Sequence, residues 1–141
     1  MQQWEEKRIS GSDSDIVWYE IGTGPEVLFL HGNWDHILYM SMLEEQQHNF
    51  RTILLKQRGT DCWKSPREYD TLPLQLFLQD IEHLRAHKGG GKLTIVGHSW
   101  GATLGLHYAC AYPDNVRKLV LIGLGPLSDE MAQYYRANVR K

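Results

Sequence analysis

The sequence predicts an α/β fold, with a mostly parallel β-sheet and helices on both of its faces. Two observations support this prediction. Four short runs are almost entirely apolar, which is typical of strands buried on both faces of a parallel sheet; they are residues 27–30, 52–55, 93–96 and 118–122. Segments with helical patterns alternate with these runs, as expected when helices connect parallel strands.

The first 25 residues predict an antiparallel hairpin at the start of the sheet. Residues 7–10 form a candidate edge strand, and residues 11–15 are a cluster of Gly, Ser and Asp that is typical of a turn. Residues 16–21 are rich in β-branched and aromatic side chains, and residues 22–25 end this second strand with Gly and Pro.

Two helices are predicted between the first apolar runs. For residues 37–48 we expect Leu38 and Met42 on the inner side of the helix. Between residues 74 and 84 the apolar side chains recur at helical spacing and form one stripe. Three glycines, residues 89–91, are expected to end this second helix.

Two further helices are predicted in the C-terminal half. Residues 100–112 have the length and composition of a helix, and residues 113–115 read as a turn. Ser128 is the expected N-cap of a last helix that runs towards Lys141.

Length and composition are those of one globular domain, residues 1–141, with 42% hydrophobic and 23% charged residues. The formal net charge of -2 provides no basic surface for nucleic acid, and no apolar run is long enough to cross a membrane. The N-terminus lacks the apolar core of a signal peptide, and Cys62 and Cys110 match no metal-binding spacing. We therefore expect a cytoplasmic protein with free thiols and with neither a metal nor an organic cofactor.

The motif that carries chemistry is Gly-His-Ser-Trp-Gly, residues 97–101, which lies between an apolar run and a helical segment. In a Gly-x-Ser-x-Gly turn between a strand and a helix, the serine hydroxyl is exposed and can act as a nucleophile. The glycines let neighbouring backbone approach closely, and the N–H groups at the start of the helix favour an oxyanion. We therefore predict Ser99 as a catalytic nucleophile.

The loops that follow the apolar strands are expected to meet at one edge of the sheet, because ligands in such sheets bind beyond the carboxyl ends of the strands. These loops contain residues 31–34, 57–60, 99 and 123–126. Their convergence predicts a site at this edge independently of the motif.

Three motifs together resemble the α/β-hydrolase superfamily: His31-Gly32, Gln57-Arg58-Gly59 and Gly97-His98-Ser99-Trp100-Gly101. They are similar to the proline iminopeptidase-like branch, which carries an Asp-Gln-Arg-Gly loop and a Gly-x-Ser-Trp-Gly turn. Here Lys56 replaces that Asp, and residues 31–35 read His-Gly-Asn-Trp-Asp where that branch often has His-Gly-Gly-Pro-Gly. His-Gly-Asn with Gly-His-x-Trp-Gly also resembles haloalkane dehalogenases, whose nucleophile is an Asp.

The resemblance implies a serine hydrolase that acts on esters or peptide-like amides, with an oxyanion hole formed by the backbone N–H groups of Asn33 and Trp100. Trp34 and Arg58 are candidate pocket residues; for Arg58 the alternatives are binding a substrate carboxylate and bracing its own loop. The resemblance covers nearly the whole chain but only about the first half of the family fold. We therefore expect a truncated α/β-hydrolase domain that lacks the lid and the last strands.

The sequence offers no suitable general base for this chemistry. A serine hydrolase of this type needs an acid and then a histidine after the serine. The only histidine after Ser99 is His107, inside a predicted helix, whereas Asp129 is a candidate acid and His36 the least unsuitable histidine elsewhere. The chain alone is therefore expected to be a weak hydrolase or inactive.

Three interpretations stay open: the N-terminal part of a serine hydrolase, a non-catalytic binding module that keeps the fold, and a half-enzyme completed by a second chain. The edge of the strand at residues 118–122 would be unpaired, and unpaired edges favour association. We expect a homodimer or a complementing chain at this edge, and a small ester or peptide-like molecule as substrate.

Overall fold

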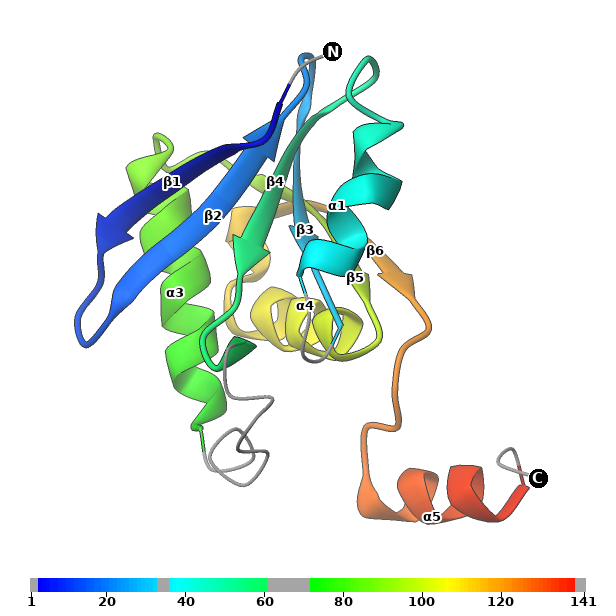
Figure 1. The fold of residues 1–141 in the computed structure, drawn as a ribbon. Helices are drawn as coiled ribbons and strands as arrows, with labels where there is room; N and C mark the ends of the chain where they lie inside the picture. The colour runs from blue at the N-terminus through cyan, green and yellow to red at the C-terminus, as the bar shows by residue number, and fades with distance from the viewer. Residues whose placement is uncertain (1–2, 33–35, 61–71, 139–141) are drawn as a thin grey trace.

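The structure is a computed structural model that describes residues 3–32, 36–60 and 72–138. Its centre is one sheet of six strands: β1 Glu5–Ser10, β2 Asp15–Ile21, β3 Glu26–Leu30, β4 Arg51–Lys56, β5 Leu93–His98 and β6 Val116–Ile122. They lie in the order β1-β2-β4-β3-β5-β6 (Figure 1). The strands β4, β3, β5 and β6 are parallel to one another. Strand β2 is antiparallel to both of its neighbours, β1 and β4. The predicted mostly parallel α/β sheet is confirmed.

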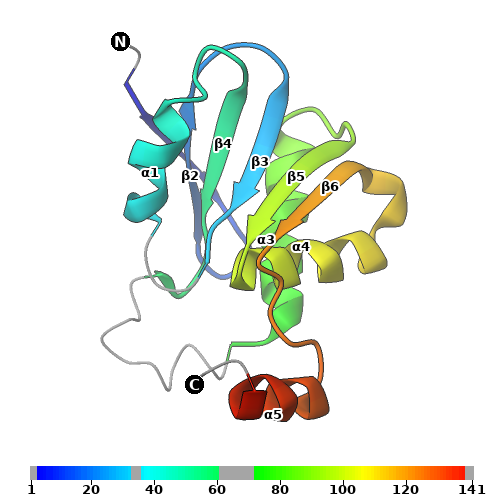
Figure 2. The ribbon, with the colours of Figure 1, turned by 90° about the vertical axis from the view of Figure 1, so that its right-hand side faces the viewer.

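Helices cover both faces of this sheet. The described helices of the chain are α1 Ile37–Glu44, α3 Leu74–His87, α4 Trp100–Ala111, the short 3₁₀ helix η2 Pro113–Asn115, and α5 Asp129–Asn138. Helix α1 lies on one face, and α3 and α4 lie on the other (Figures 1 and 2). Within the described ranges, none of these helices combines the length and the apolar character needed to cross a lipid bilayer.

The main core lies between the sheet and the helices α3 and α4. The predicted apolar stripe of α3 is confirmed, because Phe77, Leu78, Ile81 and Leu84 are all buried. They pack with buried side chains of the strands and of α4, namely Trp18, Leu28, Leu30, Ile53, Leu55, Ile95, Leu104 and Tyr108. This packing fixes α4, and with it the turn that begins the helix, against the sheet.

The predicted inner face of α1 is wrong. Leu38 and Met42 are 72% and 54% exposed, whereas Leu43 is buried and packs with Phe29 and Leu54 on the sheet. The reason is that α1 is apolar around most of its circumference, so the sequence shows no polar side that marks solvent. The helix also ends at Glu44, and residues 45–49 form turns instead of continuing it.

The predicted helix ends are largely confirmed. Gly89 and Gly90 follow α3 with φ of 105° and 75°, and the Gly90 N–H donates to the Arg85 carbonyl at 2.9 Å. The Ser128 hydroxyl accepts the Met131 N–H at 3.2 Å, which confirms Ser128 as an N-cap. Figure 1 shows α5 set apart from the sheet.

Candidate active site

The Ser99 turn lies where the strand order reverses. From β3 the chain passes to β4 on one side, and then through α3 to β5 on the other side of β3. Open α/β sheets bind ligands outside the carboxyl ends of the strands at such a reversal. His31 and Gly32, which follow β3, and Ser99, which directly follows β5, lie at this position.

Ser99 has an unusual backbone conformation. In the part of the chain that the structure describes, it is the one non-glycine residue with positive φ, at φ 55° and ψ -118°. The turn holds it there, because its N–H donates to the Ile122 carbonyl at 2.9 Å and its carbonyl accepts the N–H groups of Ala102 and Thr103. Such conformations cost about 1–3 kcal/mol and cluster at functional sites. The geometry is the sharp strand-to-helix turn that the motif predicts.

Steric constraints require glycine at both positions that flank the Ser99 turn, 97 and 101. A Cβ on Gly97 would overlap the carbonyl oxygen of Gly101, and a Cβ on Gly101 would overlap that of Leu30. Strand β3 and the start of α4 therefore approach more closely than any side chain would allow. This contact brings the end of β3 next to the nucleophile position.

The loops after β3, β4 and β5 are joined by one chain of hydrogen bonds. The Trp100 indole N–H donates to the Gln57 side-chain oxygen at 2.9 Å, and the Gln57 amide donates to the His31 carbonyl at 2.8 Å. The Gln57 backbone N–H also donates to the His31 ring at 3.3 Å. Trp100 packs edge-on against Phe77, with ring centroids 5.6 Å apart. The predicted convergence is therefore confirmed for the described parts of these three loops. For the fourth predicted loop, residues 123–126, a Cβ built on Gly123 would lie 3.8 Å from the His98 ring.

Tyr39 of α1 also reaches this edge, which sequence reasoning missed. The Gly32 N–H donates to the Tyr39 hydroxyl at 3.0 Å, and that hydroxyl lies 2.8 Å from Nδ1 of His98. The omission follows from the wrong face assigned to α1. Had residues 36, 39, 40 and 43 been taken as the inner side, Tyr39 would have pointed to the sheet.

Arg58 lies between two carboxylates. Its guanidinium donates to Asp80 at 2.7 and 2.8 Å and to Asp13 at 2.9 and 3.1 Å. Hydrogen bonds to Asp80 first, and to Asp13 second, raise the pKa of Arg58 above its usual range. These contacts favour the bracing role, since they tie the loop after β4 to α3 and to the β1–β2 turn.

Several predicted residues lie outside the described part of the chain. These are Asn33, whose N–H is the predicted second oxyanion donor, and the candidate pocket residue Trp34. The other predicted oxyanion donor is the N–H of Trp100, the first residue of α4. First-turn N–H groups point out of the end of a helix, here towards the Ser99 turn. The roles of Ser99, Asn33 and Trp100 stay predictions.

The histidines are placed away from the role of general base. His107 is exposed on α4 and lies eight residues after Ser99, a rise of about 12 Å along the helix. His36 is buried and stacks on Tyr19 of β2, with centroids 5.2 Å apart. His31 and His98 contact Gln57 and Tyr39, as described above. Asp129 begins α5, which stands apart from the sheet.

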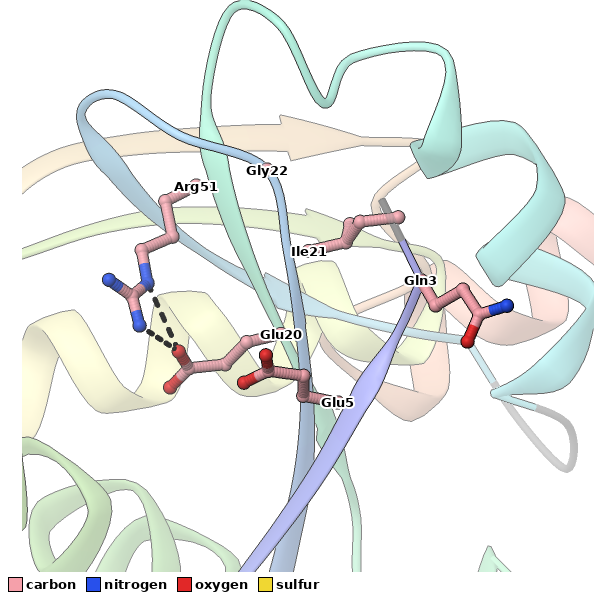
Figure 3. A pocket seen from close by; sticks show the side chains of 6 residues that line it. All are labelled: Gln3, Glu5, Glu20, Ile21, Gly22 and Arg51. Carbon is pink, nitrogen blue, oxygen red and sulfur yellow. Dashed lines mark hydrogen bonds and ion pairs between the residues drawn. The ribbon is translucent and has the colours of Figure 1, made fainter. Parts of the chain in front are cut away.

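A polar pocket of about 350 Å³ opens at the opposite edge of the sheet (Figure 3). It is lined in part by Glu20 and Arg51, which are joined at 2.6 and 3.0 Å. Lys88 at 2.7 Å, Lys7 at 3.3 Å and the Trp18 indole at 2.8 Å also donate to the Glu20 carboxylate. Burial alone would raise the pKa of Glu20, but these hydrogen bonds outweigh it and lower the pKa to about 2. Because these donors surround the carboxylate, we interpret the cluster as structural.

Among the described residues, no group of three or more His, Cys, Asp or Glu side chains is arranged to hold a metal ion. At the carboxyl-end edge of the sheet, the hydroxyl of Ser99 lies on a strained turn, next to Gly32 at the end of β3 and to the N-terminus of α4. That arrangement suits nucleophilic attack on an electrophilic carbon.

Residues 25–140 match the family model described as alpha/beta hydrolase fold. Among curated proteins, the chain is 32% identical to epoxide hydrolase 3 of Mus musculus, over 83% of this chain and 34% of that protein. It is 37% identical to proline iminopeptidase of Neisseria meningitidis, over 77% of this chain and 36% of that protein. Among solved structures, an epoxide hydrolase of Bacillus megaterium superposes with a TM-score of 0.72 at 26% identity, over 94% of this chain and 46% of that one.

The chain therefore belongs to the alpha/beta hydrolase fold family. It spans about a third of the length of the two curated relatives and about half that of the B. megaterium structure. Epoxide hydrolases and a proline iminopeptidase both stand among its relatives.

Proposed function

We propose that this chain carries the nucleophile and the oxyanion-stabilising part of a serine hydrolase that acts on small esters or peptide-like amides. The observation that carries the proposal is the Ser99 turn, with its positive φ and its close approach to the end of β3. A serine held on such a turn, before a helix N-terminus, suits attack on a carbonyl and stabilisation of the oxyanion that results.

The chemistry of serine favours acyl transfer over epoxide opening. Attack of a serine oxygen on a carbonyl carbon expels the leaving group and forms an ester, which water then hydrolyses to restore the hydroxyl. Attack of the same oxygen on an epoxide carbon breaks the C–O bond of the ring and forms an ether. Water does not cleave that ether under mild conditions, so Ser99 would stay alkylated and the enzyme could not turn over again. The likeness to proline iminopeptidase fits the acyl reaction better than the likeness to epoxide hydrolases does.

We further propose that the acid and base come from polypeptide added at the β6 edge, either in a longer chain or in a second one. In the described part of the chain β6 pairs with β5 alone. Val120 and Ile122 on this strand are each 47% exposed. An apolar strand with one unpaired side is a template for further strands.

A comparison of two reagents tests the proposed reaction. The protein is exposed to p-nitrophenyl acetate and, separately, to styrene oxide, and adducts are located by mass spectrometry. We expect acetylation of Ser99 that accumulates, because without a base the acyl group leaves slowly, and no adduct from the epoxide at Ser99. The Ser99→Ala variant should remain unacetylated at this turn, and Ser41→Ala, which removes an exposed serine of α1, should react like wild type. Alkylation of Ser99 by styrene oxide would contradict the proposal.

A further inference from the structure

Tyr39 joins the two backbone segments that flank the candidate site. Its hydroxyl oxygen accepts the Gly32 N–H at 3.0 Å. Since the oxygen accepts that bond, the hydroxyl proton can be directed to Nδ1 of His98, 2.8 Å away. Gly32 follows β3, and His98 immediately precedes Ser99. The Tyr39 side chain of α1 therefore bridges Gly32, at the end of β3, and the turn that contains His98 and Ser99.

Gly32 lies in a narrow space between this hydroxyl and the nucleophile position. A Cβ built on Gly32 would lie 2.6 Å from the Tyr39 hydroxyl oxygen and 3.4 Å from the Ser99 Cβ. Gly32 is thus held against the Ser99 turn on one side and against Tyr39 on the other. A side chain at this position would push the two segments apart.

The aromatic ring places the hydroxyl for this contact. Tyr39 is half-buried in the apolar cluster on the α1 face, with its ring centroid 5.4 Å from that of Phe29 and 5.7 Å from that of His98. A packed ring has few alternative rotamers, so its hydroxyl is held in place at little further entropic cost.

We propose that Tyr39 is a positioning residue, whose hydroxyl ties Gly32, at the end of β3, to the Ser99 turn and so holds that turn and the start of α4 in shape for reaction at Ser99. The inference rests on the proposed function of Ser99. The Gly32 N–H is occupied by Tyr39, so it does not serve as an oxyanion donor. The two predicted donors, Asn33 and Trp100, follow closely after the residues that Tyr39 binds, Gly32 and His98. A shift of the Ser99 turn would misalign the Trp100 N–H, the donor that lies in the described part of the chain, and such misalignment is costly in catalysis.

The test is Tyr39→Phe, which keeps the ring and removes the hydroxyl. Tyr19→Phe is the matched control, because it removes a hydroxyl bound to Glu6 from the same apolar cluster. Two quantities are measured in the 141-residue protein. The first is hydrogen exchange of the Gly32 amide together with the ¹⁵N shift of His98 Nδ1. The second is the rate at which a fluorophosphonate reacts with Ser99.

We expect Tyr39→Phe to speed exchange of the Gly32 amide by about fivefold to tenfold, the effect of one lost hydrogen bond, and to shift the His98 Nδ1 resonance. The fluorophosphonate rate should fall by about tenfold, which is less than the loss of a whole oxyanion donor. Tyr19→Phe should change neither quantity. An unchanged fluorophosphonate rate, or unchanged Gly32 exchange, in Tyr39→Phe would overturn the inference. If wild type does not react while Gly32 exchange still responds, the proposed nucleophile fails and the Tyr39 bridge stands.

Discussion

At the residue scale, Ser99 is held in a conformation that its side chain disfavours. Its φ of 55° is stabilised by the hydrogen bond to Ile122 and by the packing of Gly97 and Gly101. A sequence motif can reveal such a residue, because steric overlap leaves glycine alone at the flanking positions. The sequence could not reveal Tyr39, since its role depends on the rotation of α1, and an almost uniformly apolar helix does not encode that rotation.

The strain at Ser99 predicts a gain in stability when it is relieved. Ser99→Gly should be more stable than Ser99→Ala by about 1 kcal/mol, because glycine adopts positive φ freely and this gain exceeds its larger loss of entropy on folding. The free energy of unfolding in urea measures the difference. Equal stability of the two variants would show that the turn stores no strain.

At the element scale, the Glu20 cluster ties four elements together at the edge of the sheet opposite Ser99. Glu20 of β2 binds Lys7 of β1, Arg51 of β4 and Lys88, which directly follows α3. Local sequence patterns predicted β4 and α3 from their apolar residues, β2 from its β-branched and aromatic residues, and β1 as a candidate edge strand at residues 7–10 before a turn. The cluster itself joins residues up to 68 positions apart, and no local pattern encodes such pairs.

The low pKa of Glu20 predicts a dependence of stability on pH. The pKa of Glu20 is about 2 in the folded protein, below the ordinary 4.5 expected of the unfolded chain. Its stabilisation is therefore complete above about pH 4.5 and is lost as the pH falls towards 2. Glu20→Gln should lower the free energy of unfolding at pH 7 by about 2 kcal/mol, the value of hydrogen bonds to a charged group.

The same variant should lose less stability than wild type on acidification, as measured by urea unfolding at several pH values. Glu26→Gln is the control, because this half-exposed carboxylate also faces Lys88, at 3.2 Å. It should have little effect, since exposed ion pairs contribute little. Parallel pH profiles of wild type and Glu20→Gln would refute the stabilising role of the cluster.

At the scale of the whole molecule, the sheet is apolar and incompletely covered at its β6 end. The alternation of apolar runs and helices was enough to predict the α/β class, because burial leaves a clear apolar mark on β3 and β4. The apolar run at residues 118–122 also predicted a buried strand, but in this part it is wrong, because β6 is partly exposed in the described chain. The motifs predicted the family, and the match to the alpha/beta hydrolase fold model confirms it. The acid and base could not be placed in this chain. The proposed homodimer or complementing chain stays a prediction.

The exposed edge predicts association of the isolated chain. Val120→Lys should shift a dimer or larger species towards the monomer, because it places a charge among the exposed apolar side chains of β6. Thr23→Lys adds the same charge in the exposed turn between β2 and β3, two strands that do not pair with β6, and should leave the oligomeric state unchanged. Light scattering after size-exclusion chromatography measures both. A wild-type chain that is monomeric at all concentrations would contradict the prediction.

The most direct test of the central claim is the reaction of Ser99 with a fluorophosphonate in the native chain and in the same chain unfolded by urea. When a triad member is missing, the oxyanion hole and substrate binding alone still give about a thousandfold rate advantage over water, and we expect the same stabilisation to act on attack by the Ser99 hydroxyl. We therefore expect native Ser99 to react faster than unfolded Ser99 by about that factor, with no labelling of this peptide in Ser99→Ala. If native Ser99 reacts no faster than the unfolded residue, the turn is a structural feature of the fold and Ser99 is not a nucleophile.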